Sequence, residues 1–246
     1  MENPLLRKLE RFTKLSADDR EALDRLASQR IRRRRHREDM IHEGDKPDHV
    51  NPILEGWACR YKMLADGRRQ ILAFLVPGDL CDLHVYILRE MDHSIGTITP
   101  VKHAEITLED FDRAIDGRHR VMQALWWDTL VTAAVQREWT TDIGQRSAIE
   151  RIAHLLLELF YRLESVGLTN GNACELPLTQ AEIAEAMGMT PVHANRVLQE
   201  LRGMGVIELS SKRLVIPDRA ALGRIAHFNP NYLHLQRDGS HLDAND

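Results

Sequence analysis

The side chains best suited to specific chemistry lie close together at Thr190, His193, Asn195 and Arg196. Arginine and asparagine can each make two hydrogen bonds to the edge of one base, and arginine also neutralises a phosphate. Residues of this kind favour recognition of a nucleic acid. No nucleophile motif accompanies them, so the same segment does not suggest catalysis.

Two short helices joined by a glycine turn are predicted to hold these side chains. Thr179 caps the first helix, and Glu182 three residues later completes a capping box. Gly188 ends this helix in a left-handed turn. Thr190 caps the second helix, with Pro191 at its first position. The pattern predicts a helix-turn-helix whose second helix enters a major groove; a helical hairpin in an unrelated core is the alternative.

A β-hairpin is expected directly after this motif, with strands at 206–209 and 213–216 around the turn Ser210-Ser211-Lys212. The hairpin makes the motif a winged variant, in which Lys212 and Arg213 are placed to contact the DNA backbone. The predicted DNA-contacting residues are Thr179, Gln180, Thr190, Val192, His193, Asn195, Arg196, Lys212 and Arg213.

The region from 40 to 115 is predicted to form an antiparallel β-roll of the jelly-roll type. Turn signals recur at glycines 44, 56, 67 and 78, and Asp66-Gly67 is a tight-hairpin signal. Strand-like runs lie between the turns and after them, at 50–54, 57–64, 70–76, 95–99 and 104–107. Short helices are expected before the roll, over 4–27, with Ser16 as a cap.

An apolar stripe from Met122 to about Trp139 predicts a long helix. Its width favours a coiled-coil seam with a second copy of the chain, against a purely intramolecular core helix. Gly144 is expected to weaken the helix, which places a hinge and domain boundary at 142–145. The predicted seam residues are Met122, Leu125, Thr129, Leu130 and Ala133.

The fold class is therefore α+β, in three parts: a roll over 1–115, a long helix and hinge over 116–145, and a winged helix-turn-helix domain over 146–246. Another amphipathic helix is expected from Ile149 to about Val166. A C-terminal extension with a helix at 220–227 follows the wing, and a polar tail begins near Asp238.

This order of parts resembles the family of the cyclic AMP receptor and the fumarate/nitrate reduction regulator (Crp/Fnr), over about residues 10–216. The most specific pieces are the segment Leu178–Leu201 with the following Gly203–Ile207, and the glycine series of the roll. The resemblance implies a homodimeric transcription regulator that reads a two-fold related DNA site and contacts RNA polymerase. It places Val192, Asn195 and Arg196 at the base-reading positions. Pro191 and Val192 depart from the polar readers common in the family.

The resemblance also raises the question of an effector in the roll, whose binding would reorient the recognition helices. The family's cyclic-nucleotide pocket has Gly-Glu and Arg-Ser, where this chain has Cys81-Asp82 and His93-Ser94. A neutral imidazole cannot replace a bidentate guanidinium, which argues against a cyclic nucleotide. The effector-pocket candidates are Cys81, Asp82, His84, His93, Ser94, Trp126 and Trp127.

Metal and redox cofactors have little support in the sequence. The three cysteines Cys59, Cys81 and Cys174 exclude a four-cysteine iron–sulfur cluster by count. Cys81 and His84 form a Cys-x-x-His that leaves haem open, although a buried thiol beside a histidine is the simpler interpretation. Cys174 is interpreted as a passive thiol, with an oxidation switch as the alternative. No metal site is predicted, and the effector stays unknown.

Composition sets the outer limits on function. The 246 residues carry 33 Lys and Arg against 37 Asp and Glu, so the net charge is −4, yet residues 190–216 hold four basic and two acidic residues. Six arginines between Arg30 and Arg37 are interpreted as a solvated strand, with a phosphate or partner contact as the alternative. The widely spaced cysteines and the charged start of the chain predict a cytoplasmic protein without a membrane segment.

Two other functions compete with DNA binding. A cupin-like metalloenzyme would use the histidines of the roll, but the chain lacks the His-x-His pair that this site needs. A protein-interaction module would keep the roll and the helix-turn-helix without reading DNA. Because neither alternative explains the capped helix-turn-helix, a non-enzymatic DNA-binding regulator is the preferred hypothesis.

Overall fold

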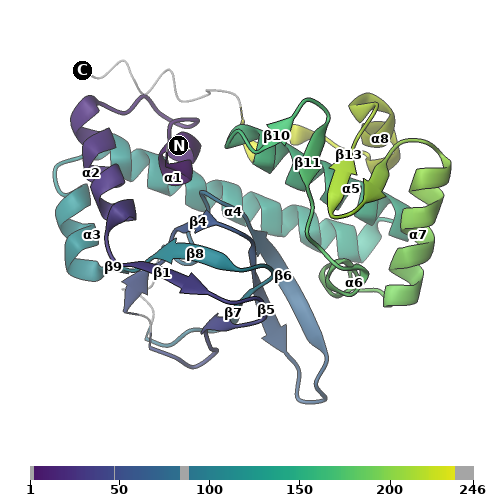
Figure 1. The fold of residues 1–246 in the computed structure, drawn as a ribbon, viewed down its shortest axis with the longest axis horizontal. Coiled ribbons are helices and arrows are strands. Elements are labelled where there is room, and N and C mark those ends of the chain that lie inside the picture. Colours follow the sequence, from purple (N-terminus) through teal and green to yellow (C-terminus); the bar gives the residue numbers. More distant parts are fainter. Residues whose placement is uncertain (1–2, 47, 84–88, 236–246) are drawn as a thin grey trace. The chain divides into compact units, whose positions relative to one another are not determined.

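The computed structural model describes residues 3–46, 48–83 and 89–235 (Figure 1). The chain forms two compact units. The first unit combines Met1–Lys62 and Ala73–Thr132 with the C-terminal segment from His234, and the second combines Met63–Leu72 with Ala133–Leu233. The boundary between the two units, at Thr132 and Ala133, falls inside the long helix. The three domain ranges expected from the sequence stay a prediction.

Three helices of the first unit lie together near the start of the long helix (Figure 1). Ser16 caps the second of them and forms the capping box with Asp19, so this predicted cap is confirmed. Thr107 caps the third, where its hydroxyl accepts from the Asp110 amide at 3.2 Å. The helices are α1 (Pro4–Leu9), α2 (Ala17–Ser28) and α3 (Leu108–Ile115).

The predicted antiparallel roll is confirmed, in three sheets with the orders β1-β8-β4, β2-β7-β5-β6 and β3-β9. Its strands are short and pair in antiparallel fashion. They are β1 (Ile31–Arg34), β2 (Asp39–Ile41), β3 (His49–Val50), β4 (Ile53–Glu55), β5 (Ala58–Met63), β6 (Arg69–Leu75), β7 (Ser94–Thr97), β8 (Val101–Ala104) and β9 (Ile106–Thr107).

The glycines of the roll form the turns that their spacing predicts, as Gly67 and Gly56 illustrate. Gly67 has φ of 84° in the turn between β5 and β6, where the Leu64 amide donates to the Arg68 carbonyl at 2.8 Å. Gly56 has φ of 83°, and a Cβ at this position would collide with the carbonyl oxygen of Pro100. Only glycine combines this backbone conformation with so close an approach.

The arginine run includes an edge strand, since β1 is the outer strand of the sheet β1-β8-β4 among the described residues. Arg32 forms an ion pair with Glu105 at 2.9 Å, and Arg34 forms one with Glu38 at 3.0 Å. The strand interpretation is confirmed, and charged side chains on an edge also discourage pairing with another sheet.

Two apolar clusters stabilise the first unit. One lies between the N-terminal helices and the roll and includes Leu9, Leu26, Phe111 and Leu125. The other fills the roll, around Ile53, Leu75 and Ile95. The N-terminal helices are therefore part of this unit's core.

The long helix α4 spans His119–Gln145 and continues through Gly144. The helical conformation is interrupted after it, at Arg146 and Ser147, and the next helix is α5 (Ala148–Ser165). The break thus lies just beyond the expected position, because one glycine is not enough to end a helix that is packed on its neighbours. Whether this point acts as a hinge stays a prediction.

The second unit contains the predicted helix-turn-helix and wing. Its sheet has the order β10-β11-β13-β12, so two further strands extend the wing hairpin. The remaining elements are α6 (Gln180–Met187), α7 (Pro191–Gly203), α8 (Arg219–Ala226), β10 (Thr169–Asn170), β11 (Ala173–Glu175), β12 (Glu208–Ser210), β13 (Arg213–Val215) and the short 3-10 helix Pro230–Leu233.

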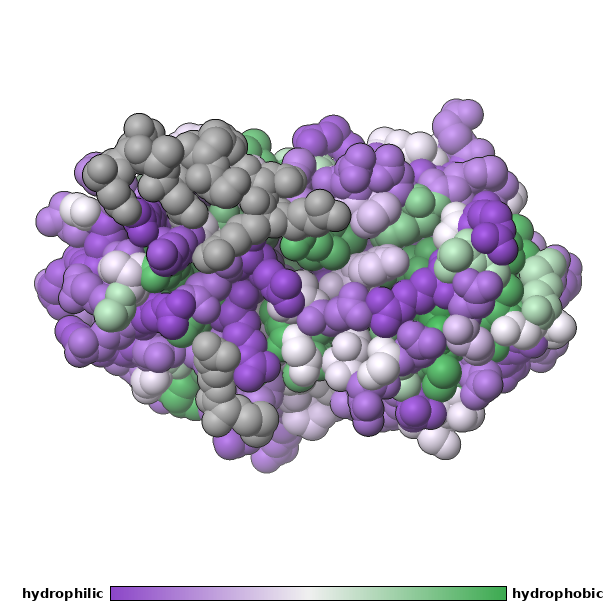
Figure 2. Space-filling model, turned by 90° about the horizontal axis from the view of Figure 1, so that it is seen from above, coloured by the Kyte–Doolittle hydropathy of each residue, from purple (hydrophilic) through white to green (hydrophobic). Residues whose placement is uncertain are grey.

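The surface seen in Figure 2 is mostly hydrophilic, with hydrophobic residues in separate patches. Within the described ranges, no helix has both the length and the apolar character needed to cross a membrane. The expected polar tail from Asp238 lies outside the described residues.

Candidate nucleic-acid interface

The two helices of the motif are fixed at their ends by their own side chains. The Thr179 hydroxyl accepts from the Glu182 amide at 3.2 Å, and the Glu182 carboxylate accepts from the Thr179 amide at 2.7 Å. Gly188 is left-handed, with φ of 62°. The Thr190 hydroxyl accepts from the His193 amide at 3.2 Å, and Pro191 opens α7. Every predicted cap of the motif is confirmed.

Helix α7 has one apolar face and one outward face. Its buried side chains are those of Ala194, Val197, Leu198 and Leu201. The other face, at steps of three and four residues, carries four side chains that point away from this core: Val192, Asn195, Arg196 and Gln199.

The outward face has few internal ties. Gln199 Nε2 lies 3.4 Å from Asn195 Oδ1, which makes a weak amide pair. Arg196 has no ion-pair partner within the described part of the chain. Gln199 is missing from the sequence-based set, although its position four residues after Asn195 could have identified it. His193 and Asn195 are both half-buried, whereas Val192, Arg196 and Gln199 are exposed.

The wing turn presents two more cations. Strand register pairs Ser210 with Arg213, which leaves Ser211 and Lys212 as a two-residue turn. Both have positive φ, 48° and 62°, as a type I′ turn requires. Lys212 and Arg213 are exposed, and neither forms an ion pair among the described residues. Thr179 and Gln180 are exposed at the start of α6. The contact of these four residues with DNA stays a prediction.

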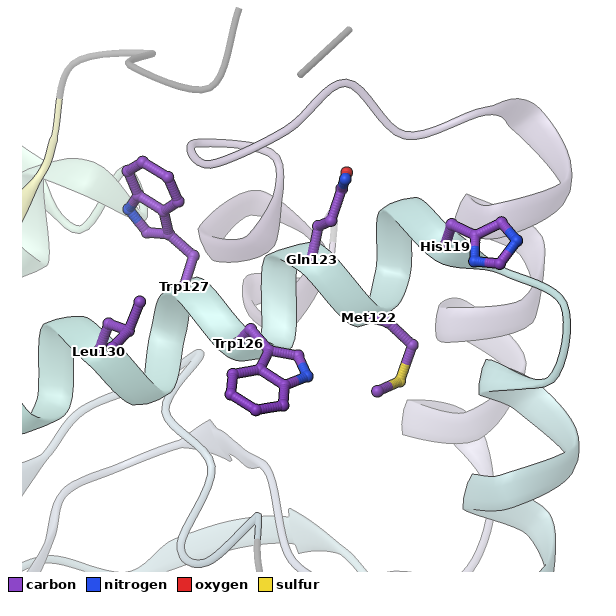
Figure 3. Close-up of a pocket in the computed structure, with 6 residues that line it drawn as sticks. All are labelled: His119, Met122, Gln123, Trp126, Trp127 and Leu130. Carbon is purple, nitrogen blue, oxygen red and sulfur yellow. The ribbon is translucent and has the colours of Figure 1, made fainter. Parts of the chain in front are cut away.

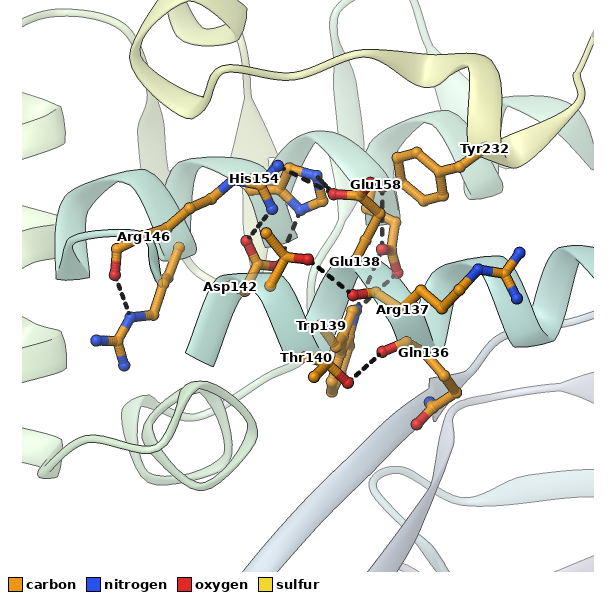
Figure 4. A network of polar contacts seen from close by, with 12 residues as sticks. Gln136, Arg137, Glu138, Trp139, Thr140, Asp142, Arg146, His154, Glu158 and Tyr232 are labelled. Carbon is orange, nitrogen blue, oxygen red and sulfur yellow. Dashed lines mark hydrogen bonds and ion pairs between the residues drawn. The ribbon is translucent and has the colours of Figure 1, made fainter. Parts of the chain in front are cut away.

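A buried polar cluster lies in the interior of this unit (Figure 4). Glu158 on α5 is 0% exposed, and its carboxylate accepts from Trp139 Nε1 at 3.1 Å and from the Tyr232 hydroxyl at 3.1 Å. Arg162 approaches it at 3.2 Å. Burial raises the pKa of the Glu158 carboxyl, and the nearby Arg162 opposes that shift only in part.

His154 forms the second half of the cluster. Its Nδ1 lies 3.1 Å from Asp142 Oδ2, and its ring stacks on Tyr232 with centroids 5.7 Å apart. Asp142 also pairs with Arg146 at 2.7 Å. The cluster joins the end of α4, α5 and the C-terminal extension, so the extension is part of this unit's core.

The long helix presents an exposed apolar face. Trp126 is 65% exposed and Leu130 is also exposed, with Met122 half-buried beside them. A depression of about 500 Å³ lies along this face, lined by His119, Met122, Gln123, Trp126, Trp127 and Leu130 (Figure 3). In the view of Figure 3, Trp126 and Met122 point to one side of α4, whereas Trp127 and Gln123 point to the other.

The structure corrects one assignment on this helix and places two others. Leu125 is only 3% exposed and belongs to the core beside α1 and α2, so it does not face a partner. Trp126 lines the depression described above, and its place in an effector pocket stays a prediction. Trp127 packs instead on Phe12 and His234, with ring centroids 6.1 and 5.5 Å away. Thr129 is half-buried and Ala133 exposed, and their place in a seam stays a prediction.

The effector candidates of the roll do meet, around His93. Its Nε2 lies 3.3 Å from Asp82 Oδ2, and its Nδ1 lies 2.6 Å from Asp92 Oδ1. Burial disfavours the charged imidazole, but Asp82 and Asp92 outweigh burial and raise the pKa of His93. Two carboxylates thus surround His93, the residue that the family resemblance aligns with the phosphate-binding arginine.

The other candidates are placed less favourably for a ligand. Arg60, which is not one of these candidates, donates to the carbonyl oxygens of Leu80 and Cys81, at 3.1 and 2.6 Å. Cys81 is fully buried, and burial raises the pKa of its thiol. The Ser94 hydroxyl accepts from the Glu43 amide at 2.9 Å. The His84 of the Cys-x-x-His pair lies outside the described residues.

No group of three or more His, Cys, Asp or Glu side chains is placed to hold a metal ion in the described ranges. Cys174 is buried in the wing sheet, and burial raises the pKa of its thiol to about 11. A thiol that stays protonated is a poor nucleophile, which supports its interpretation as passive.

Two family models match the chain. The Crp-like helix-turn-helix domain matches residues 150–225, and the cyclic nucleotide-binding domain matches residues 32–118. The transcriptional activator protein FnrL of Cereibacter sphaeroides is 30% identical over 180 residues, which are 72% of either chain. The nitrogen fixation regulation protein FixK of Azorhizobium caulinodans is 30% identical over 184 residues, covering 72% of this chain and 71% of that one.

The fold is also that of a solved regulator. The structure of FixK2 from Bradyrhizobium japonicum matches with a TM-score of 0.70 and 24% identity, over 79% of this chain and 96% of that one. These relatives are regulators rather than enzymes, so the cupin-like alternative is wrong. The matched domains, the relatives and the capped helix-turn-helix agree: the chain is a DNA-binding transcription regulator and belongs to the Crp/Fnr family.

Proposed function

We propose that the chain regulates transcription as a homodimer that binds a two-fold related DNA site. The observation that carries this proposal is the outward face of α7, which exposes Val192, Arg196 and Gln199 and leaves Arg196 without an internal ion pair in the described residues. Asn195 and Arg196 are suited to base edges because each can form two hydrogen bonds at once. Lys212 and Arg213 in the wing are suited to phosphates, which fix the register of the protein on the duplex.

Dimerisation would use the exposed face of α4. Met122, Trp126, Leu130 and Ala133 follow one another at steps of four, four and three residues, which gives one stripe along the helix. A tryptophan alone buries about 150–250 Å² on contact with a partner, so this stripe offers much of the apolar area that a seam needs. A second copy of α4 meets it with the same residues, as two-fold symmetry demands.

The partners beyond DNA follow from the relatives. Some relatives are named as activators, which supports transcription activation and a contact with RNA polymerase in the cytoplasm. The roll would sense an effector and, through α4, reorient the recognition helices near Gly144. The carboxylates around His93 argue that this effector is not a cyclic nucleotide, because Asp82 and Asp92 repel a phosphate.

The effector proposal is tested by thermal unfolding with millimolar cyclic AMP. A ligand present at 100 times its Kd stabilises the native state by about 2.7 kcal/mol, which shifts the Tm measurably. We expect no shift for the wild-type protein. A rise in Tm that increases with the cyclic AMP concentration would show instead that the chain binds the nucleotide.

The DNA proposal is tested by binding to promoter fragments over a range of salt concentrations. Two wing cations in each protomer give four phosphate contacts per dimer, so log K should fall with log salt at a slope of about −4 or steeper. Absence of binding at low salt, with an intact dimer, would favour the protein-interaction module.

The dimer proposal is tested by sedimentation. Leu130→Glu introduces a charge into the stripe and should give monomers, whereas Leu168→Glu, at an exposed leucine of the second unit, should leave the dimer intact. The monomeric variant should lose most of its affinity for a two-fold site but keep its helical circular dichroism. If Leu130→Glu stays dimeric, the seam lies elsewhere.

A further inference from the structure

Val192 is an apolar side chain in a polar setting. It is 72% exposed, although a valine is among the residue types most often buried in proteins. The apolar contacts of α7 are already made by its opposite face, through Val197, Leu198 and Leu201. Val192 therefore contributes little to the core of the second unit, and its exposure calls for a different use.

Its position on α7 is at the front of the recognition helix. The Thr190 cap and the first helical residue Pro191 make Val192 the second residue of the helix. Asn195, Arg196 and Gln199 follow at three, four and seven positions later, so all four side chains share one face. In a helix-turn-helix the N-terminal residues of the second helix contact base edges. Val192 reaches the groove together with the polar readers.

The chemistry of a valine selects one group in that groove. Its side chain cannot donate or accept a hydrogen bond, whereas most groups on the major-groove edges of the bases do one or the other. The exception is the C5-methyl group of thymine, which is apolar. A β-branched side chain also has a restricted χ1 torsion, so little conformational freedom is lost when it is held against a methyl group.

We infer that Val192 reads a thymine in each half-site through the C5-methyl group, beside the polar contacts of Asn195 and Arg196. This inference rests on the proposed binding of a two-fold DNA site and names a specificity determinant within it. A pyrimidine without the methyl group, or a base that presents a polar edge at that step, leaves the valine against water or an unpaired polar group.

The test replaces single thymines by deoxyuridine, which lacks only the methyl group. The protein first selects its own site from a random duplex library, and each thymine of the winning duplex is then exchanged in turn. At one symmetry-related pair of positions we expect the affinity to fall about fourfold for each half-site, because loss of one buried methyl group costs about 0.8 kcal/mol. At the other positions the affinity should stay within twofold.

Two variants connect this effect to the side chain. Val192→Ala shortens an exposed side chain, so its Tm should match that of the wild type, and its affinity should no longer depend on the methyl group. Met204→Ala removes another exposed apolar side chain at the end of α7 and should keep the full deoxyuridine effect.

Two results would overturn the inference: no deoxyuridine position lowers the wild-type affinity more than twofold, or the loss persists in Val192→Ala. Failure of the proposed function looks different, because then no sequence is enriched from the library and no duplex binds at low salt.

Discussion

The buried cluster around Glu158 and the outward face of α7 use similar polar side chains in opposite surroundings. Glu158 is sealed from solvent and accepts hydrogen bonds from Trp139 and Tyr232, which come from distant parts of the chain. Arg196 on α7 is exposed, and the described residues offer it no ion pair. The comparison separates two roles: buried polar groups with internal partners stabilise the unit, and exposed groups without partners remain available to bind DNA.

The largest effect is expected when the buried cluster is broken. Glu158→Ala leaves Arg162 and two hydrogen-bond donors without their acceptor in a closed environment. Removal of one partner of a buried pair costs about 3–5 kcal/mol, and we expect a loss of this size in the free energy of unfolding measured with denaturant.

The matched control for this variant is Glu164→Ala on the same helix. Glu164 is partly exposed and pairs with Arg219 at 2.8 Å, so its removal should cost less than about 1 kcal/mol. The DNA affinity of each folded molecule should be unchanged in both variants. Equal losses of stability would remove the distinction between the two kinds of polar group.

The same carboxyl predicts a dependence on pH. Because burial raises its pKa above the ordinary value of 4.5, the native state binds this proton more tightly than the unfolded chain. The resulting stability is complete below about pH 4.5 and is lost as the pH rises through the native pKa. The free energy of unfolding of the wild type minus that of Glu158→Gln should therefore fall as the pH rises. A difference that increases with pH would contradict the raised pKa.

The next largest effect concerns the exposed face. Arg196→Ala should weaken specific DNA binding by about 1–3 kcal/mol, because a bidentate contact is lost, and should change the free energy of unfolding by less than about 0.5 kcal/mol. Arg224→Ala on α8 is the control, since this arginine is also exposed but lies outside the motif. Unchanged specific affinity in Arg196→Ala would show that another residue reads the bases.

The exposed face could be predicted from the sequence because its signals are local. Thr179 with Glu182, Gly188, and Thr190 with Pro191 fix two helices through contacts between residues at most five positions apart. The direction of every side chain on α7 then follows from the helical repeat. The same reasoning located the roll turns at Gly56 and Gly67.

The buried cluster could not be predicted, because its contacts are distant in the chain. Trp139 and Tyr232 reach Glu158 across 19 and 74 positions, and no pattern around Glu158 announces them. The prediction that Leu125 belongs to the dimer seam is wrong for a related reason. The apolar stripe of α4 is wide, and the packing of α1 and α2 decides which of its side chains are buried within the unit. Strand β10 was missed although Asn170-Gly171 is a hairpin signal, since a two-residue strand depends on the pairing of β11 with β13.

The smallest effect is expected in the wing turn, where one residue, Lys212, affects both the stability of the unit and its contact with DNA. Lys212 has a φ of 62°, which is costly for a residue with a Cβ, and its side chain is exposed for a phosphate. Lys212→Gly should therefore raise the free energy of unfolding by about 0.5–1 kcal/mol, since relief of the strain exceeds the added freedom of the unfolded chain. It should also make the salt dependence less steep by about 2 for a dimer, because two phosphate contacts are lost.

The neighbouring Ser211 separates these two effects. Its φ of 48° is also left-handed, but its side chain carries no charge. Ser211→Gly should stabilise the unit by a similar amount, about 0.5–1 kcal/mol, and leave the salt dependence of DNA binding unchanged. If Lys212→Gly gains stability and keeps the wild-type salt dependence, Lys212 is not a phosphate contact. If Lys212→Gly is less stable than the wild type, the left-handed backbone of Lys212 does not destabilise the turn. Lys212 would then not exchange stability for a DNA contact.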